Sequence, residues 1–401
     1  MKGLIELHGE VEREVYLDSE NSGLIFPEAL EELMKAYSES GYANPSITHK
    51  AGWKSYEVLY RASEEFSRIL NASPVELAYT HGATEANNLA ILGSAKANKT
   101  GRRKIITSSI EHLSVIFPAE RLQEQGYRVT KIPVDGEGFV IRDQLEKETD
   151  DHTLLVSIGA VNHEIGVVQD LKELVEVVKD RDPSILFHTD MADALGRMRI
   201  NLKELNVDLA SFSSHKVYGP KGAGLLYVRE GVNLEPVIHG QLSSQRLWPG
   251  VENIPAIAGF VKAAEAMDKL DKIRLVKLRD RLIDGITSQV EDIVLNGPRG
   301  SGRAPDNVNI SFLYVEGEAL IVELSMRGIY ASSGSACTSR ILQPSHVLLA
   351  IGRRYEEAHG SLLMKVTPFH DEEDIDYVLR HIPQGVARLR SLSPIKRKEV
   401  K

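Results

Sequence analysis

The 401-residue chain has 42% hydrophobic residues, 26% charged residues and a formal net charge of −9 at pH 7. This length allows two packed domains, and the negative charge excludes a broad basic face for nucleic acid. No apolar run approaches the ~20 residues that a membrane span needs, and the charged N-terminus lacks a signal-peptide core, so we expect a cytoplasmic protein without membrane partners. The single cysteine, Cys337, excludes an internal disulfide framework and a zinc site built on several thiolates, and no metal is expected.

Short β-rich runs alternate with helical patterns between about residues 75 and 230. Helical patterns such as 113–125 and 171–179 separate several of these runs. The alternation predicts an α/β fold with a largely parallel sheet and helices on both faces. In chain order, the predicted strands are 104–107, 128–132, 154–160, 185–188, 209–213 and 224–228.

The rest of the chain predicts a second, smaller domain. Residues 253–271 form a long helical stretch, and residues 272–395 hold two further helical patterns and a few strands. We therefore expect a large domain over residues 15–260. A small α+β domain over residues 261–395, joined by residues 1–14, would carry the loop around Cys337.

Polar residues follow four of the predicted strands directly. In open α/β sheets, ligands bind at the carboxyl ends of the strands. Any one polar cluster would be an ordinary strand end, but four together predict a site. The clusters are Ser108 to His112, Asn162 to Glu164, His188 to Asp190, and Ser214 to Lys216.

These residue types suit pyridoxal 5′-phosphate (PLP). The amine of Lys216 can form an imine (Schiff base) with an aldehyde cofactor, and a carboxylate such as Asp190 can keep a pyridine nitrogen protonated. The segment 81–85 precedes a helical run and offers backbone N–H groups, with the hydroxyl of Thr84, to a phosphate. His112 can stack on the ring.

The chain resembles the cysteine desulfurases, in the class V aminotransferase group of fold-type I PLP enzymes. The likeness spans nearly the whole chain, and its motifs together are specific although each is weak alone. It implies a mostly parallel, seven-stranded type of sheet in the large domain, and a homodimer with sites near the subunit interface. The matching stretches are 42–49, 82–88, 111–112, 161–170, 188–190, 207–222, 252–255, 332–339 and 344–347.

The resemblance also implies a role for each matching residue. Cys337 would attack the sulfur of bound L-cysteine, hold it as a persulfide for a sulfur-acceptor or scaffold protein, and leave alanine. Asn44 and Arg340 are candidates for binding the substrate. The cofactor would be held by Lys216 and Asp190, with His112 on the ring, and with Ala83, Thr84, Ser213 and His215 at the phosphate.

Departures from the family pattern cluster around the substrate and the cofactor's phenolic oxygen. Losing an arginine–carboxylate pair costs roughly 2–5 kcal/mol, so turnover of free cysteine would suffer unless another cation substitutes. Arg340, Arg246, Arg353, Arg354 and Lys365 are candidates, although a solvated surface charge is the commoner role for each. The departures are residues 19–23 after Asp18, His163 for asparagine, Asp193 for glutamine, Val251 for threonine, and Leu363 for the arginine that grips the substrate carboxylate.

His163 and Asp193 suggest a paired change. A carboxylate facing the phenolic oxygen would repel it, so we expect a protonated His163 hydrogen-bonded to Asp193. The alternative is that both residues changed independently, in a site under relaxed constraint.

Three functions remain open. The first is a cysteine desulfurase that supplies iron–sulfur cluster assembly or thiolation, supported by the loop around Cys337 and by Lys216. The second is a PLP-dependent lyase or aminotransferase for a different amino acid, supported by the remodelled pocket. The third is a non-catalytic sulfur carrier or cluster-assembly partner, against which the presence of Lys216 argues.

Overall fold

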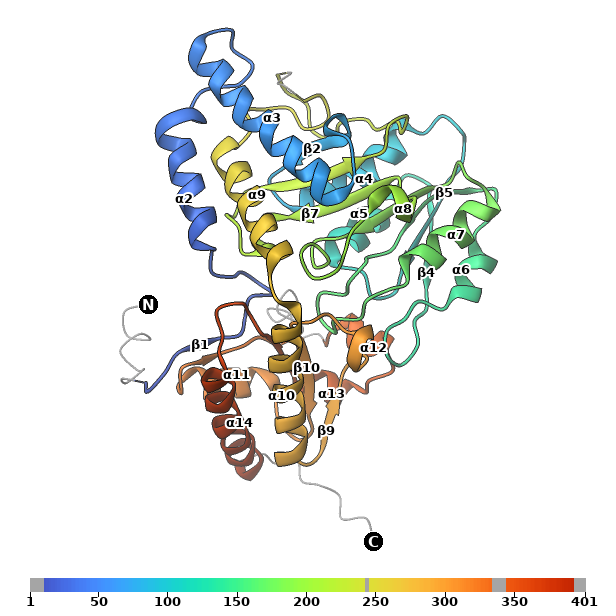
Figure 1. Ribbon diagram of the computed structural model, residues 1–401. Coiled ribbons are helices and arrows are strands. Elements are labelled where there is room, and N and C mark those ends of the chain that lie inside the picture. Colours follow the sequence, from blue (N-terminus) through green and yellow to red (C-terminus); the bar gives the residue numbers. More distant parts are fainter. Residues whose placement is uncertain (1–10, 242–244, 334–343, 393–401) are drawn as a thin grey trace.

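The computed structural model describes residues 11–241, 245–333 and 344–392. Its centre is a seven-stranded sheet with the strand order β2-β8-β7-β6-β5-β3-β4 (Figure 1). Only β8 runs antiparallel to its neighbours, so the predicted α/β fold with a largely parallel sheet is confirmed. The strands are β2 (Leu77–Thr80), β3 (Lys104–Ser108), β4 (Arg128–Ile132), β5 (Thr153–Ser157), β6 (Leu186–Asp190), β7 (Leu209–Ser213) and β8 (Gly224–Val228).

Helices cover both faces of this sheet, which explains why its central strands are buried along their whole length. Neighbouring residues point to opposite faces: Leu155 packs against helices α4 and α5, whereas Val156 belongs to the cluster under α3, α7 and α9. The helices are α2 (Pro27–Lys35), α3 (Lys50–Leu70), α4 (Ala83–Ala97), α5 (Leu113–Gln123), α6 (Arg142–Glu148), α7 (Leu171–Arg181), α8 (Leu202–Leu205) and α9 (Ile254–Lys269).

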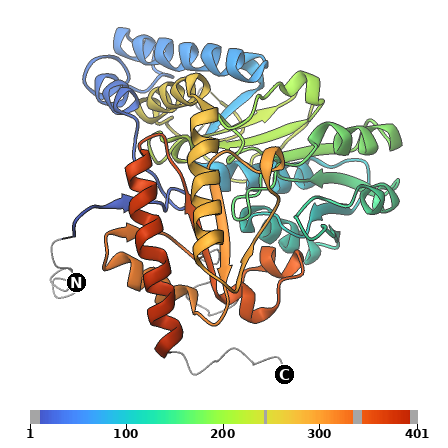
Figure 2. The ribbon, with the colours of Figure 1, turned by 60° about the horizontal axis from the view of Figure 1, so that its bottom comes forward.

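A second hydrophobic cluster joins the C-terminal part of the chain to the segment around Val15 and Leu17. Helices α10 and α14 lie side by side across a three-stranded sheet of order β12-β10-β9 (Figure 2). The division into domains at residues 260 and 261 stays a prediction. The elements here are β1 (Val15–Tyr16), α10 (Lys272–Gln289), β9 (Ile293–Leu295), β10 (Asn307–Phe312), α11 (Gly317–Ser325), β11 (Ile329–Tyr330), α12 (His346–Ala350), α13 (Tyr355–His359), β12 (Ser361–Lys365) and α14 (Glu372–Leu392).

Short helical turns connect several of these elements. The one that matters for the site is η3, which follows β7 directly. In the described part of the chain, these turns are η1 (Ala36–Ser40), η2 (Pro74–Glu76), η3 (Ser214–Val217) and η4 (Gly300–Gly302).

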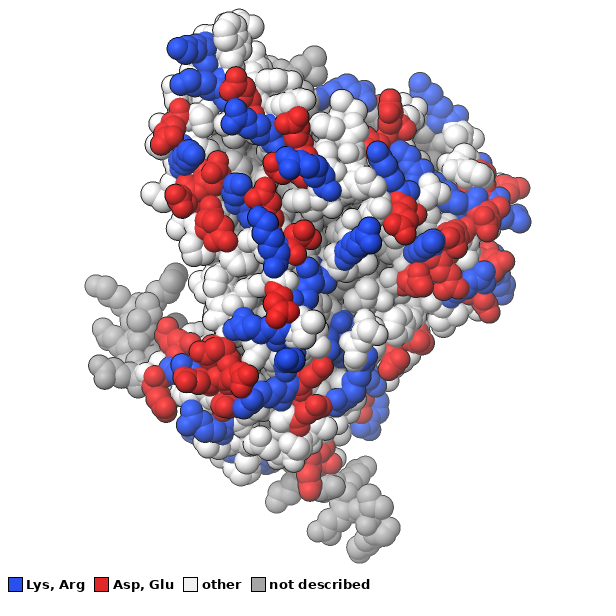
Figure 3. All heavy atoms as spheres, viewed as in Figure 1, with Lys and Arg blue, Asp and Glu red and all other residues white. Residues whose placement is uncertain are grey.

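Basic and acidic side chains are mixed on one face of the molecule (Figure 3). On the face shown in Figure 3, basic and acidic side chains are interspersed rather than gathered by sign. Among the described residues, no helix is both long enough and apolar enough to cross a membrane.

Candidate functional site

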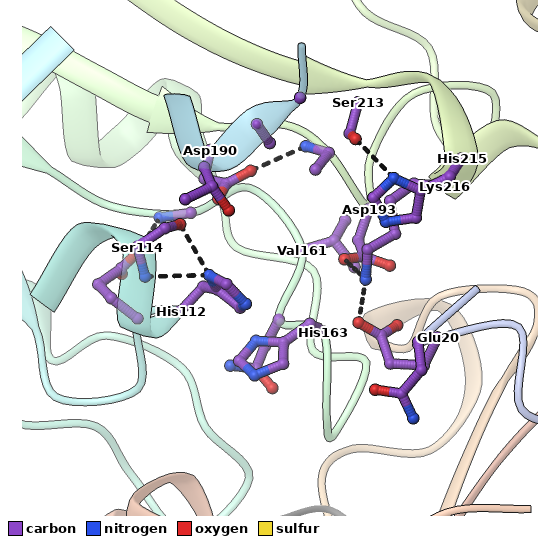
Figure 4. Close-up of a pocket in the computed structure, with 18 of the residues that line it drawn as sticks. Glu20, His112, Ser114, Val161, His163, Asp190, Asp193, Ser213, His215 and Lys216 are labelled. Atoms are coloured by element: carbon purple, nitrogen blue, oxygen red, sulfur yellow. Dashed lines mark hydrogen bonds and ion pairs between the residues drawn. The ribbon is translucent and has the colours of Figure 1, made fainter. Parts of the chain in front are cut away.

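A cavity of about 460 Å³ opens where β5, β6 and β7 end and α4 and α5 begin. All nine residues predicted to hold the cofactor line it (Figure 4). Parallel strands bring their carboxyl ends to one edge, so segments far apart in sequence meet there. The nine residues are Ala83, Thr84, His112, His163, Asp190, Asp193, Ser213, His215 and Lys216.

Lys216 lies in the turn η3, immediately after β7. Tyr218 ends this turn with φ +60, a left-handed conformation that reverses the chain toward β8. The Lys216 ammonium contacts a carboxylate oxygen of Glu20, and lies 3.2 Å from Asp193 Oδ2. The amine is thus held inside the cavity by two carboxylates.

Asp190 is the last residue of β6 and points into the same cavity. Its carboxylate accepts hydrogen bonds from Asn87 Nδ2 at 2.7 Å and from the Ala192 amide at 2.9 Å. Burial raises the pKa of Asp190 above its ordinary value. A cationic pyridine nitrogen would favour the ionised form, so this carboxylate suits such a partner.

His112 is the N-cap of α5, where its Nδ1 accepts a hydrogen bond from the Ser114 amide at 3.1 Å. Burial lowers the pKa of His112, so the ring is neutral and this tautomer carries its proton on Nε2. The His163 ring meets His112 edge to face, with 5.0 Å between centroids.

The N-terminus of α4 forms one wall of the cavity. The first-turn N–H groups of a helix lack intrahelical acceptors, and Ala83 and Thr84 present them here. A Cβ built at Gly224 would lie 2.5 Å from the backbone of Gly82, so glycine permits the close approach of β8. Ser213 Oγ lies 2.9 Å from His215 Nδ1, and both residues line the same cavity.

These features test whether PLP fits. The donor set combines a reachable amine, a buried carboxylate and a helix N-terminus, and Gly82, the N-cap of that helix, lines the cavity without a side chain. The residues present therefore fit the cofactor that the sequence predicts.

The prediction of a hydrogen bond between a protonated His163 and Asp193 is wrong. Asp193 Oδ1 instead accepts from Lys365 Nζ at 2.5 Å, and its other oxygen pairs with Lys216. Burial, together with the neighbouring His112 and Lys216, lowers the pKa of His163 well below its ordinary value, so the ring is neutral rather than protonated. Burial alone would raise the pKa of Asp193, but the two lysines hold it well below its usual range.

Lys365 was expected to be a solvated surface charge, and this expectation is also wrong. It is 2% exposed and pairs with both Glu20 and Asp193. Three other candidate cations are engaged elsewhere: Arg246 with the Leu234 carbonyl, Arg353 with Asn296, and Arg354 with Glu357.

The remaining residues that the sequence singled out lie outside the cavity lining or outside the described residues. Asn44 is not among the residues that line the cavity, and its Oδ1 accepts from the Ser46 amide at 2.9 Å. Its role in binding the substrate stays a prediction. Leu363 is buried in β12, opposite Asn309. Val251 is 62% exposed. Cys337 and Arg340 lie outside the described residues.

Sequence reasoning missed part of the site. Asn87, on the inner face of α4, orients Asp190, and it was visible only as a letter of the motif 82–88. Glu20 was noted as a departure, but nothing in its local sequence indicated that it would meet Lys216. The one available signal was general: a buried lysine such as Lys216 needs a carboxylate partner, and the sequence does not say which carboxylate this is.

Comparisons with known proteins agree with this geometry. The profile of the aminotransferase class-V family matches residues 15–378. The chain belongs to this family. Solved structures with similar folds include a NifS-like protein, with a TM-score of 0.87 and 32% identity over 94% of this chain and 100% of that chain. Another is SspA in complex with cysteine, with a TM-score of 0.76 and 31% identity over 89% of this chain and 99% of that one. The predicted fold-type I architecture is thereby confirmed.

Similar proteins among curated sequences are cysteine desulfurases. The chain is 42% identical to cysteine desulfurase IscS 1 of Archaeoglobus fulgidus over 374 residues, which cover 92% of this chain and 97% of that protein. It is 40% identical to the mitochondrial cysteine desulfurase of Saccharomyces cerevisiae over 389 residues, which cover 96% of this chain and 77% of that protein. The predicted family resemblance is confirmed.

Proposed function

We propose that this protein is a PLP-dependent cysteine desulfurase that converts L-cysteine to L-alanine and takes the sulfur on Cys337. The observation that carries the proposal is the meeting of Lys216, Asp190, His112 and the α4 N-terminus in one cavity. The identity of 42% to cysteine desulfurases supports the same reaction.

Each group of residues in the cavity would have a separate role in the reaction. Bound PLP supplies an electron sink that weakens bonds at the substrate's α-carbon. Lys216 would hold the cofactor through an imine, Asp190 would hold its ring nitrogen in the protonated state, and the first turn of α4 would bind its phosphate. The neutral His112 presents a proton on Nε2 inside the cavity, where it can be exchanged with a reacting group.

The proposed sulfur step balances without an added oxidant. The Cys337 thiolate forms a bond to the substrate sulfur while the carbon–sulfur bond breaks. The bonding electrons stay with the carbon, which takes a proton and becomes the methyl group of alanine. The thiolate is therefore left as a persulfide for an acceptor protein.

A second candidate is a PLP enzyme of the same fold that acts on a different amine. The observation that favours it is Glu20, an acidic residue beside Lys216 in the cavity. A homodimer, a sulfur acceptor in iron–sulfur cluster assembly or thiolation, and a cytoplasmic location complete the proposal as predictions.

The test is an assay of the PLP-loaded protein with L-cysteine, scored for alanine and for a persulfide on Cys337 by mass spectrometry. Cys337→Ser is the matched control. We expect alanine release that requires Cys337. Persulfide on Cys337 from an added low-molecular-weight persulfide, which transfers its outer sulfur and leaves as a thiol, without alanine from cysteine, would instead support a carrier.

A further inference from the structure

Four charged side chains meet at the floor of the cavity. Lys365 Nζ lies 2.5 Å from Glu20 Oε2 and 2.5 Å from Asp193 Oδ1. Lys216 Nζ contacts Glu20 Oε1 and lies 3.2 Å from Asp193 Oδ2. Each carboxylate therefore places one oxygen on each lysine. The four groups come from separate segments: the loop after β1, the loop after β6, the turn η3 and the strand β12.

Charge balances in this cluster only when the Lys216 nitrogen is positive. The four side chains are between 2% and 11% exposed, so water screens them little. Two positive lysines and two carboxylates cancel, whereas a neutral Lys216 nitrogen leaves one negative charge in excess. An unbalanced buried charge is strongly unfavourable, so these surroundings favour the positive form of that nitrogen.

The same nitrogen is the one that would carry the cofactor. An imine forms at Lys216 Nζ itself, the atom that both carboxylates meet here. An imine nitrogen is neutral when it has no proton, and it is positive with one N–H when it is protonated. Only the protonated imine keeps the cluster of Glu20, Asp193, Lys216 and Lys365 balanced.

Other basic groups around the cluster do not replace this charge. Burial lowers the pKa of His112, His163 and His215, so these three rings are neutral near pH 7. Arg197 is positive, but its Nε donates to Asp306 at 2.6 Å, and this buried pair cancels. The positive charge is therefore left to the Lys216 nitrogen.

The neighbouring acids act in the same direction as the two carboxylates of the cluster. Asp18 interacts with Glu20 and Lys216, and Glu164 interacts with Glu20. Burial raises the pKa of Asp18, and it raises that of Glu164 to about 8. Each of these groups adds negative charge when it ionises. Asp190 also lines the cavity, where a protonated ring nitrogen would cancel its charge.

We propose that Glu20 and Asp193 hold the Lys216 nitrogen positively charged while it is joined to the cofactor, which prepares the imine for attack by the substrate amine. The inference rests on the proposed function for its cofactor, and it adds two positioning residues to that reaction. A protonated imine accepts an amine more readily than a neutral one, because the displaced electron pair moves onto a positive nitrogen.

The exchange of Lys216 for the substrate amine then balances. L-cysteine enters with an ammonium group and loses one proton, and its nitrogen adds to the imine carbon. The bond from that carbon to the Lys216 nitrogen breaks, and Lys216 takes up the proton that the substrate lost. The substrate nitrogen is now the protonated imine, and Lys216 is an ammonium that regains its contacts with Glu20 and Asp193.

The test is a pH titration of the PLP-loaded protein without substrate. Protonated and neutral imines absorb at different wavelengths, so the midpoint between them is read from the absorption spectrum and needs no turnover. Glu20→Gln and Asp193→Asn each remove one negative charge with little change in shape. Glu20→Gln combined with Lys365→Met removes one charge of each sign. Glu28→Gln, at an exposed position in α2, is the matched control.

An opposite charge within about 4–6 Å shifts a protonation midpoint by about 1–3 pH units. We expect the wild-type imine to be protonated at pH 7. Its midpoint should fall by about 1 unit or more in Glu20→Gln and in Asp193→Asn, because the cluster is then balanced by a neutral imine. The double variant should return toward the wild-type midpoint, a recovery that a purely structural role of Glu20 would not produce.

Two results would overturn the inference: a wild-type imine that is neutral at pH 7, or single variants whose midpoints match those of wild type and Glu28→Gln. If Glu20→Gln does not fold, Asp193→Asn and the double variant decide in the same way. Predicted shifts in a protein that releases no alanine from cysteine would overturn the proposed reaction alone. Alanine release without any shift in the variants would overturn the inference alone.

Discussion

The ammonium group of Lys365 lies 2.5 Å from a carboxylate oxygen of Asp193, although 172 residues separate them in the sequence. The contact joins β12 to the loop after β6, the strand that ends at Asp190. Burial alone would lower the pKa of Lys365, but Asp193 and Glu20 raise it above its ordinary value. Both partners are therefore charged, and the cavity floor depends on their pairing.

Replacing Lys365 should destabilise the protein. In Lys365→Met, Glu20 and Asp193 lose a buried partner, which costs on the order of 3–5 kcal/mol in the free energy of unfolding. The thermal midpoint of the cofactor-free protein should fall by several degrees, as measured by differential scanning calorimetry. Lys365→Arg keeps the charge and should recover part of the loss.

The matched control for this change is Lys35→Met on the exposed side of α2. We expect its midpoint to match that of the wild type. Equal midpoints for Lys365→Met and Lys35→Met would show that the ion pairs at the cavity floor contribute nothing to stability.

Removing Asn87 should weaken cofactor binding. Its amide donates to Asp190 at 2.7 Å and to Ser114 Oγ at 2.8 Å, so it holds the carboxylate in place. A hydrogen bond to a charged group contributes about 1.5–3 kcal/mol, so Asn87→Ala should bind PLP about 10- to 100-fold more weakly. Equilibrium titration of the apoprotein with PLP measures this directly.

The neighbouring Asn88 provides the control on the same helix. Its amide donates to the Thr84 carbonyl and does not reach Asp190. Asn88→Ala should bind PLP within about threefold of wild type, since a solvent-facing hydrogen bond contributes little. Similar losses in both variants would mean that α4 as a whole, rather than the contact to Asp190, sets the affinity.

Stability should depend on pH through Glu164. Burial raises the pKa of Glu164 to about 8, while Ser345 Oγ donates to its carboxylate at 2.5 Å. The folded protein thus keeps a proton that the unfolded chain releases above about pH 4.5. This group's contribution to stability is present below pH 4.5 and is lost between pH 4.5 and 8, by about 1.4 kcal/mol per pH unit.

Glu164→Gln removes this titration. Between pH 5 and 8, the variant's midpoint should fall less than that of wild type in a thermal scan. Parallel pH profiles for the two proteins would show that Glu164 titrates normally in the folded state.

Local sequence patterns predicted the large sheet well. Residues 128–132, 209–213 and 224–228 coincide with β4, β7 and β8. The buried strands β7 and β8 read as short apolar runs between turns, whereas β-branched residues marked the more exposed edge strand β4. The strand β2 was missed, since four residues at a sheet edge carry little periodic signal. The predicted run 154–160 extends past the end of β5, where Ile158 and Ala160 are buried and their amides still donate to the carbonyls of His188 and Asp190.

The site divides in the same way. Asp190 ends β6, and Lys216 and His112 lie within four residues after the ends of β7 and β3, so their meeting follows from the rule for the carboxyl edge of a parallel sheet. The ion pairs of Glu20 and Lys365 depend on how residues after β1 and in β12 pack over that edge, and no local pattern encodes this packing. The predicted hydrogen bond between His163 and Asp193 is wrong for this reason, because Lys365 donates to the Asp193 carboxylate instead.

The most direct test of the account is to locate the cofactor covalently. Borohydride reduction of the PLP-loaded protein, followed by proteolysis and mass spectrometry, identifies the lysine that carries it. We predict a single labelled peptide containing Lys216, because Lys365 is buried and held protonated by two carboxylates. Label on Lys365, or no label on Lys216, would contradict the assignment of the site.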